Sequence, residues 1–224
     1  MKVAILGFAP SYVDAPFNDL SVSIWTMNYH HQDVTRTDRI FELHDWDTVT
    51  KEGHVASLQA TKAPVYMQDV RPEIPTSVRY PIEAMTERYR LPNTDTPYFT
   101  NTASYMIALA IEEGVTELQL YGLDMTHDTE YGSQRPSCEF FLGVAVGKGI
   151  RVVIHRLSDL CKTAFLYGYE DTKRNWFRDK LLQRRKFLVE FHDQHKAEME
   201  RHARALSEFS GALQNHDHIL KVWG

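Results

Sequence analysis

The chain opens on an apolar segment that stops abruptly at a glycine. Residues 2–6 read Lys-Val-Ala-Ile-Leu, and Gly7-Phe8-Ala9-Pro10-Ser11 follows directly. A short continuous apolar run is typical of a strand that is buried on both faces in a parallel sheet. Gly7 permits a sharp turn at the end of that strand, and Pro10 with Ser11 suits the first turn of a helix. Because open α/β sheets bind ligands at the carboxyl ends of their strands, this segment predicts both a fold and the place of a site.

Further strand candidates recur along the chain with amphipathic or irregular segments between them. They cover residues 22–26, 39–43, 64–67, 117–121 and 151–154, and helices are predicted over 100–113 and 136–148. This alternation predicts an α/β, Rossmann-like domain with a mostly parallel sheet flanked by helices. Residues 45–97 contain prolines at intervals that break long elements, so we expect loops, short helices and a lid or small insertion there.

The last fifty residues have a different character. Residues 173–214 contain no proline and no glycine before Gly211. Apolar residues spaced by three, four or seven positions predict a long amphipathic helix, or two. We therefore divide the chain into a nucleotide-binding domain (1–170) and a C-terminal helical arm (171–224). The arm could pack on its own domain, and we favour self-association into a homo-oligomer.

Composition narrows the class of protein. The 224 residues carry a net charge of −5, so the large basic field of a non-specific nucleic-acid binder is missing, although a local basic patch stays open. The longest apolar run, 106–111, is too short for a membrane span. Cys138 and Cys161 form neither a disulfide framework nor a CxxC site. With Met1 directly before the first strand we expect no signal peptide, a cytoplasmic location and no structural metal.

The loop after the first strand offers backbone N–H groups to an anion. Such amides beside a helix start suit a phosphate, so Gly7, Ala9, Pro10 and Ser11 are candidate nucleotide contacts. The loop matches neither G-x-G-x-x-G nor the P-loop pattern, and a tight turn without a ligand is the alternative.

Two polar residues follow the next strands. The Asn28 amide follows the second strand and has both a donor and an acceptor for a base or a sugar hydroxyl; a turn-forming asparagine is the alternative. His44 follows the third strand, where it could be a general acid, a general base or a hydrogen-bond donor.

Two later segments place polar groups at expected ligand positions. Asn101, Thr102, Ala103 and Ser104 open the central helix, which suits a phosphate or ribose, with ordinary capping as the alternative. Gly122 and Asp124 end the fifth predicted strand, where a carboxylate can bind ribose, hold Mg²⁺ or act as a base.

A polar loop follows Asp124. Within it, His127 could move a proton, and Arg135 could clamp a phosphate with two parallel hydrogen bonds. Loops that carry this chemistry on a rigid scaffold are often functional, although plain solvation remains open.

These segments together resemble a group of variant Rossmann-like transferases. That group includes bacterial sialyltransferases that use CMP-sialic acid, and the related hydroxymethylpterin diphosphokinase-like proteins. The matching segments are Gly7–Ser11, similar to a Gly-x-Gly-Pro-Ser loop; Asn28; 101–106, similar to Thr-Ser-Gly-x-Tyr-Met; and 122–124, similar to Gly-Ile-Asp. Order and approximate spacing agree over about the first 155 residues and leave the tail uncovered.

The resemblance implies nucleotide contacts at these four segments and favours a CMP-type nucleotide or nucleotide sugar, with Mg²⁺ possible. Three departures stand out. Ala9 replaces the second glycine, His44 stands where the family has an asparagine, and 131–135 hold no histidine where the family has its catalytic one.

Several functions fit this pattern. The first is a glycosyltransferase that uses a nucleotide-activated sugar, with His127 or His44 as the base and Arg135 at the leaving phosphate. A diphosphokinase-like enzyme would use ATP and Mg²⁺, and a nucleotide- or DNA-modifying enzyme is a further form. The other readings are a non-catalytic nucleotide-binding oligomeric module, and a scaffold whose main role lies in the tail.

Overall fold

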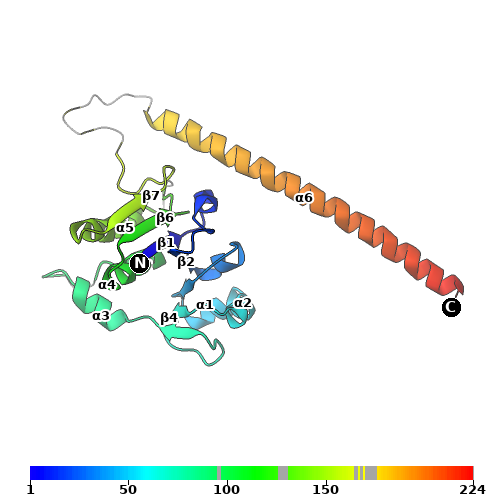
Figure 1. Cartoon of the computed structure of the whole chain (residues 1–224), viewed down its shortest axis with the longest axis horizontal. Helices are drawn as coiled ribbons and strands as arrows, with labels where there is room; N and C mark the ends of the chain where they lie inside the picture. Colours follow the sequence, from blue (N-terminus) through cyan, green and yellow to red (C-terminus); the bar gives the residue numbers. More distant parts are fainter. Residues whose placement is uncertain (95–96, 126–130, 164–165, 167–168, 170–175, 224) are drawn as a thin grey trace. The chain divides into compact units, whose positions relative to one another are not determined.

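The computed structural model describes residues 1–94, 97–125, 131–163, 166, 169 and 176–223. The chain divides into two units, Met1–Thr163 and Ala164–Gly224. The first is an α/β unit built on a seven-stranded sheet, and the second contains one long helix (Figure 1). The predicted boundary at residue 170 lies outside the described residues.

All seven strands of the sheet run parallel. They are β1 (Lys2–Leu6), β2 (Val22–Met27), β3 (Arg39–Glu42), β4 (Val65–Met67), β5 (Ser77–Arg79), β6 (Glu117–Tyr121) and β7 (Arg151–Ile154), in the order β5-β4-β3-β2-β1-β6-β7. The chain moves outward from β1 to β5 and then places β6 on the opposite side of β1. The predicted Rossmann-like fold is thus confirmed, and the topological switch point lies between β1 and β6.

Helices cover both faces of this sheet. They are α1 (Trp46–Lys51), α2 (Val55–Ala60), α3 (Ile82–Tyr89), α4 (Thr102–Glu112), α5 (Tyr131–Gly147) and two 3₁₀ turns, η1 (Pro10–Asp14) and η2 (Asn28–Gln32). Alternate residues of β1 face opposite ways: Val3 and Ile5 join the core beneath α3, α4 and α5, whereas Ala4 and Leu6 join a cluster on the other face. A third cluster, around Ile40, packs under α1 and α2. Figure 1 shows the two sets of helices on opposite sides of the strands.

Two elements differ from the sequence-based expectation. Strand β5 lies between Pro75 and Pro81 in a segment expected to form loops, and it is an edge strand of the sheet, where nearby prolines cost the fewest ladder hydrogen bonds. Helix α5 begins at Tyr131, five residues before the expected start at Pro136. Pro136 is the sixth residue of this helix, where it cannot donate a hydrogen bond to the first turn, and the helix continues past it to Gly147.

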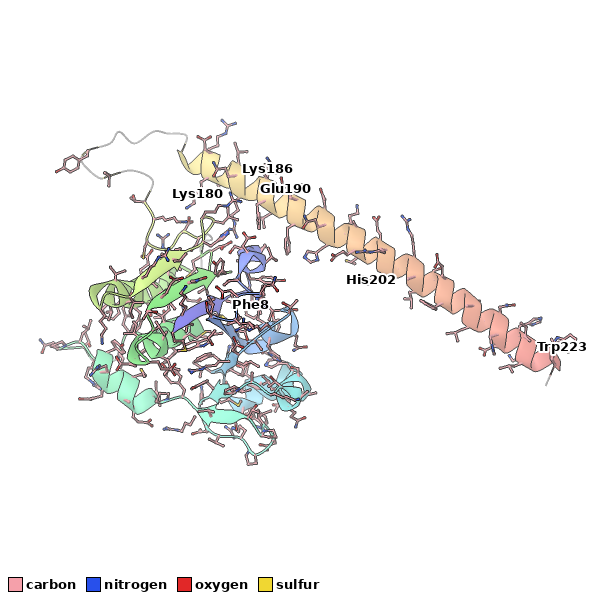
Figure 2. The ribbon with its side chains drawn as sticks, in the orientation of Figure 1. Phe8, Lys180, Lys186, Glu190, His202 and Trp223 are labelled. Carbon is pink, nitrogen blue, oxygen red and sulfur yellow. The ribbon has the colours of Figure 1, made fainter. Side chains whose placement is uncertain are left out.

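The second unit contains α6 (Trp176–Trp223), a single helix of 48 residues. At 1.5 Å per residue it is about 72 Å long. Side chains stand out on all sides of it, with His202 in its middle and Trp223 at its end (Figure 2). No described helix is apolar enough over a sufficient length to cross a bilayer.

Candidate functional site

The loops after β1 and β6 meet at the switch point, where two backbone hydrogen bonds join them. The amide of Gly7 donates to the carbonyl of Tyr121 and the amide of Ala9 donates to the carbonyl of Gly122, both at 2.9 Å. The approach is so close that a Cβ added to Gly7 would lie 2.5 Å from the Gly122 oxygen. Two amides expected to face a phosphate are therefore engaged between the strands.

Ser11 and Asp124 lie beneath this contact. The Ser11 hydroxyl, which is fully buried in η1, donates to Asp124 Oδ1 at 2.5 Å and accepts from the Gly122 amide at 2.8 Å. Pro10 opens η1 and fixes its first turn. The structure thus brings the candidates of the first loop and of the Gly122–Asp124 turn together in one hydrogen-bonded group.

An aromatic cluster connects this group to the end of β2. The ring centroids of Phe8 and Tyr29 lie 4.8 Å apart, and His30 lies 4.8 Å from Phe8 and 4.5 Å from Tyr12. Phe8 and Tyr29 are 40% and 46% exposed, and each lies two residues beyond the carboxyl end of its strand, β1 or β2. Exposed rings at this edge can stack on a base or a sugar.

Asn28 begins η2 directly after β2 and has a left-handed backbone, with φ at 51°. Its side-chain oxygen is buried and accepts no hydrogen bond, and the Nε2 atoms of His30 and His31 share this condition. Burial lowers the pKa of both histidines. Because buried polar atoms are nearly always satisfied, three of them within four residues indicate a place for a ligand or ordered water.

His44 lies two residues beyond β3 and is held by a buried carboxylate. Glu42 is fully buried, and its Oε1 atom lies 2.7 Å from His44 Nδ1, while its Oε2 atom lies 2.8 Å from Nε2 of the buried His54. The far nitrogen of His54 lies 3.7 Å from Glu52. His44 itself is 42% exposed, so one end of this chain of side chains reaches the surface.

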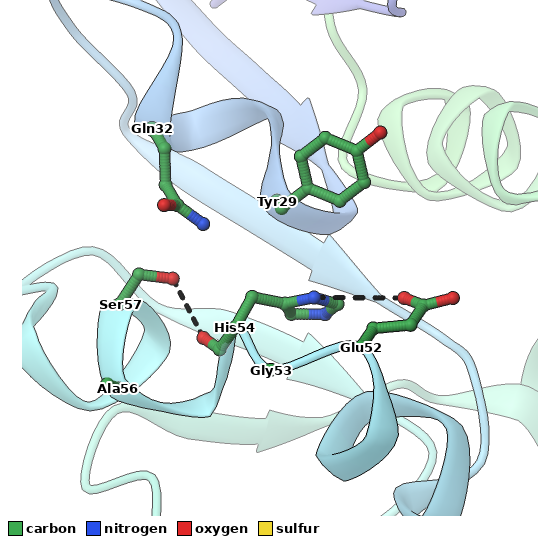
Figure 3. A pocket seen from close by; sticks show the side chains of 7 residues that line it. All are labelled: Tyr29, Gln32, Glu52, Gly53, His54, Ala56 and Ser57. Carbon is green, nitrogen blue, oxygen red and sulfur yellow. Dashed lines mark hydrogen bonds and ion pairs between the residues drawn. The ribbon is translucent and has the colours of Figure 1, made fainter.

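An open cavity of about 880 Å³ lies beside His54 and Glu52 (Figure 3). Its lining comes from η2, from the turn between α1 and α2, and from α2 itself, and consists of Tyr29, Gln32, Glu52, Gly53, His54, Ala56 and Ser57. Tyr29 and Gln32 face His54 and Ser57 across it. Its single acidic lining residue and lack of Lys or Arg disfavour a phosphate in this cavity.

A smaller cavity of about 320 Å³ lies further along the same edge, at the ends of β3, β4 and β5. Leu43 and Tyr105 both line it, so α4 contributes to the rim next to His44. The candidate residues that follow β1, β2, β3 and β6 thus all lie along one carboxyl edge of the sheet.

The start of α4 is tied into the fold. Asn101 caps the helix, because its Oδ1 atom accepts from the Ser104 amide at 2.8 Å, and its Nδ2 atom donates to the Gln134 carbonyl of α5 at 3.1 Å. Ser104 and Ala103 are buried and Thr102 is half-buried. The side chains of Asn101 and Ser104 therefore act in capping and in helix contact, the alternative weighed from the sequence.

Of the two candidates in the polar loop after Asp124, the structure describes only Arg135. Arg135 pairs with Glu139 one helical turn away, with Nε and Oε1 2.7 Å apart, and its Nη2 atom donates to the Lys162 carbonyl. A phosphate at Arg135 would compete with that carboxylate. His127 lies outside the described residues. Among the described residues no group of three or more His, Cys, Asp or Glu is arranged to hold a metal ion.

No known family model matches the chain, and no curated protein does. Solved structures that resemble it include a mutant of α-2,3/8-sialyltransferase CstII, at 11% identity and a TM-score of 0.43, covering 80% of this chain and 99% of that one. The structure of CstII from Campylobacter jejuni with CMP-3FNeuAc is 12% identical with a TM-score of 0.45, and the match covers 80% of this chain and 98% of that one. The structure of CST-II with a trisaccharide acceptor and CMP is 11% identical with a TM-score of 0.44, and the match covers 80% of this chain and 98% of that one. At these identities and TM-scores the likeness carries no argument about what this chain does.

Sequence reasoning missed Glu42 and His54. The signal for Glu42 was present, since a carboxylate inside the predicted buried strand 39–43 requires a partner. His54 gave no comparable signal, because it lies in the proline-interrupted segment whose short helices had no clear periodicity.

Proposed function

We propose that this chain is a transferase that uses a nucleotide-activated sugar, with its site at the carboxyl ends of β2 and β3. One observation carries the proposal. Asn28, whose side-chain oxygen is buried and unpartnered, directly follows β2, and exposed His44, held by buried Glu42, follows the neighbouring strand β3. The unpaired hydrogen-bond acceptor of Asn28 supplies a binding group, and the fixed imidazole of His44 supplies a proton-transfer group.

The nucleoside would lie over the end of β2. Asn28 Oδ1 can accept from an exocyclic amino group or a ribose hydroxyl, and the exposed faces of Phe8 and Tyr29 provide a surface for the base. A cytosine has such an amino group, which agrees with the CMP-type nucleotide that the sequence resemblance favours. We assign Gly7, Ala9, Ser11 and Asp124 the role of holding the two loops in place beneath it.

In the transfer step an acceptor hydroxyl attacks the anomeric carbon of the donor sugar. The carbon–oxygen bond to the phosphate breaks, the phosphate leaves with the bonding electron pair, and the hydroxyl proton passes to His44 Nε2. His127 is the second candidate for this proton. Arg135 would stabilise the leaving phosphate by exchanging Glu139 for it.

Thermal shift with CMP, UDP, GDP, ADP and ATP, each with and without Mg²⁺, tests the proposal. A ligand at one hundred times its dissociation constant adds about 2.7 kcal/mol of stability. We expect metal-independent stabilisation by CMP that Asn28→Ala abolishes. Asn93→Ala is the matched control, because Asn93 also has a left-handed backbone, with φ at 61°, and is exposed elsewhere.

Other outcomes decide against this assignment. Stabilisation only by ATP with Mg²⁺ would favour the diphosphokinase-like enzyme. Binding of CMP without transfer from CMP-sugars, unchanged by His44→Ala, would favour the non-catalytic module. No stabilisation by any of the five nucleotides would refute a nucleotide site.

We also propose that α6 joins a second copy of this chain. Its last 25 residues carry a stripe with alternating steps of three and four, typical of a coiled-coil seam. The stripe consists of Met199, His202, Leu206, Phe209, Leu213, His216, Leu220 and Trp223. Its apolar members are 59–86% exposed within this chain, an unusually long apolar face for a helix in water.

Light scattering on the full chain tests the second copy. Leu206→Glu with Leu213→Glu should halve the mass, because two charges would then face each other in the seam. Ser207→Glu with Gln214→Glu adds the same charges one position along and should leave the mass unchanged. A monomeric wild-type chain would refute the proposal.

A further inference from the structure

Glu42 is the buried centre of a chain of four side chains. One carboxylate oxygen faces His44 Nδ1 at 2.7 Å and also lies 3.2 Å from the His44 backbone amide. The other oxygen faces His54 Nε2 at 2.8 Å. Glu52 lies on the far side of His54 and lines the larger cavity.

A purely structural role explains this arrangement poorly. Burying a carboxylate costs free energy unless its oxygens are well paired, and an apolar residue fills the end of a buried strand without that cost. His44 does not need the contact for its own burial, since 42% of its side chain is exposed. A buried anion that orients an exposed imidazole is the arrangement found where a ring nitrogen must be presented to a reactant.

The hydrogen bonds determine which nitrogen of His44 carries the proton. An ionised carboxylate only accepts hydrogen bonds, so each ring nitrogen that faces Glu42 must be protonated. His44 Nδ1 therefore carries its proton, and in the neutral ring Nε2 holds the lone pair. The described residues place no hydrogen-bond partner at that Nε2 atom.

We propose that Glu42 is a positioning residue that fixes the tautomer and ring orientation of His44, and that His54 holds Glu42 in place from behind. The role in sugar transfer rests on the proposed function, whereas the tautomer does not. His54 fixes the second oxygen, so the carboxylate cannot rotate away when His44 accepts a proton at Nε2. Glu42 thereby also balances the charge of the imidazolium.

Nitrogen-15 NMR of the histidine rings in the full chain measures this directly, with signals assigned from their loss in His44→Gln and His54→Gln. We expect the Nδ1-protonated form at His44 in the wild type. Glu42→Leu should remove this preference. Glu52→Gln is the control, because it contacts His54 only on the far side and should leave His44 unchanged.

Glu42→Gln gives a sharper, asymmetric expectation. The His44 backbone amide can only donate, so the amide oxygen of the new side chain must stay on the His44 side. Its NH₂ group then faces His54, which must move its proton to Nδ1, toward Glu52. We expect an unchanged His44 signal and a switched His54 signal. This variant keeps the shape of the side chain and serves if Glu42→Leu does not fold.

Kinetics separate a positioning role from a structural one. With an active transferase, Glu42→Leu should lower kcat by about 10²- to 10⁴-fold with little change in KM. An Nε2-protonated or freely exchanging His44 in the wild type, or an unchanged His44 in Glu42→Leu, would overturn the proposal. The expected tautomers without any transferase activity would refute the proposed function alone, since the NMR needs no substrate.

Discussion

Replacing Gly122 by alanine should destabilise the sheet far more than the same change at Gly114. Both glycines have a left-handed backbone, with φ at +67° and +66°. A Cβ at Gly122 would overlap the carbonyl oxygen of Gly7, a backbone atom that cannot rotate aside, whereas nothing lies within 4 Å of a Cβ at Gly114. The two substitutions therefore share the backbone strain and differ in the close approach of two loops.

The difference can be estimated from the contacts. The left-handed conformation costs an alanine about 1–2 kcal/mol, which is the whole effect expected for Gly114→Ala. Gly122→Ala must also separate the two loops, so the hydrogen bonds from the Gly7 and Ala9 amides to the Tyr121 and Gly122 carbonyls are lost. Each such bond contributes about 0.5–1.5 kcal/mol, which gives a total of about 2–5 kcal/mol for Gly122→Ala.

Urea unfolding followed by tryptophan fluorescence measures both values, because Trp25 in β2 is fully buried and reports on the sheet. The free energies should be compared only if both variants keep the wild-type dependence on urea concentration. Equal losses for Gly122→Ala and Gly114→Ala would refute the reasoning. They would mean that the loops after β1 and β6 separate without cost and do not form a rigid part of the rim.

Three further predictions follow from single side chains. Burial lowers the pKa of His30 below 6.5 despite Asp33 nearby, so the unfolded chain binds this proton more tightly than the folded chain does. The free energy of unfolding in urea should therefore fall as the pH drops below 6.5, and His30→Gln should reduce this pH dependence. Burial raises the pKa of Cys138 to about 11, so in the native chain a thiol reagent at neutral pH should modify exposed Cys161 first, and Cys161→Ser should remove the fast phase. Asn101→Ala removes the cap of α4 and should cost about 1–2 kcal/mol in thermal or urea unfolding, and an unchanged midpoint would contradict the capping role.

The strands were predictable because burial on both faces leaves a plain trace in the sequence. Residues 2–6 and 151–154 each contain a run of three or four apolar residues, 117–121 alternates leucine with polar residues, and the structure forms strands at these same positions. Strand β5 was not predictable, because a three-residue edge strand between two prolines has no periodicity to detect.

The candidate site was predictable only as a set of positions. Asn28 and His44 are marked by their place directly after strands, and this much follows from the topology of a parallel sheet. Which of their atoms are already bonded depends on partners distant in sequence. Nothing in residues 7–11 indicates that the Gly7 amide meets Tyr121, and nothing around residue 44 indicates that His54 lies on the other side of Glu42.

The fastening of β1 to β6 through main-chain atoms has an evolutionary consequence. The two backbone hydrogen bonds that join the loops involve neither the Phe8 nor the Tyr29 side chain, so these exposed neighbouring positions can be substituted without loss of alignment. Descendants of this sequence can therefore alter what they recognise at these positions, while Gly7 and Gly122 must persist for as long as this fastening does.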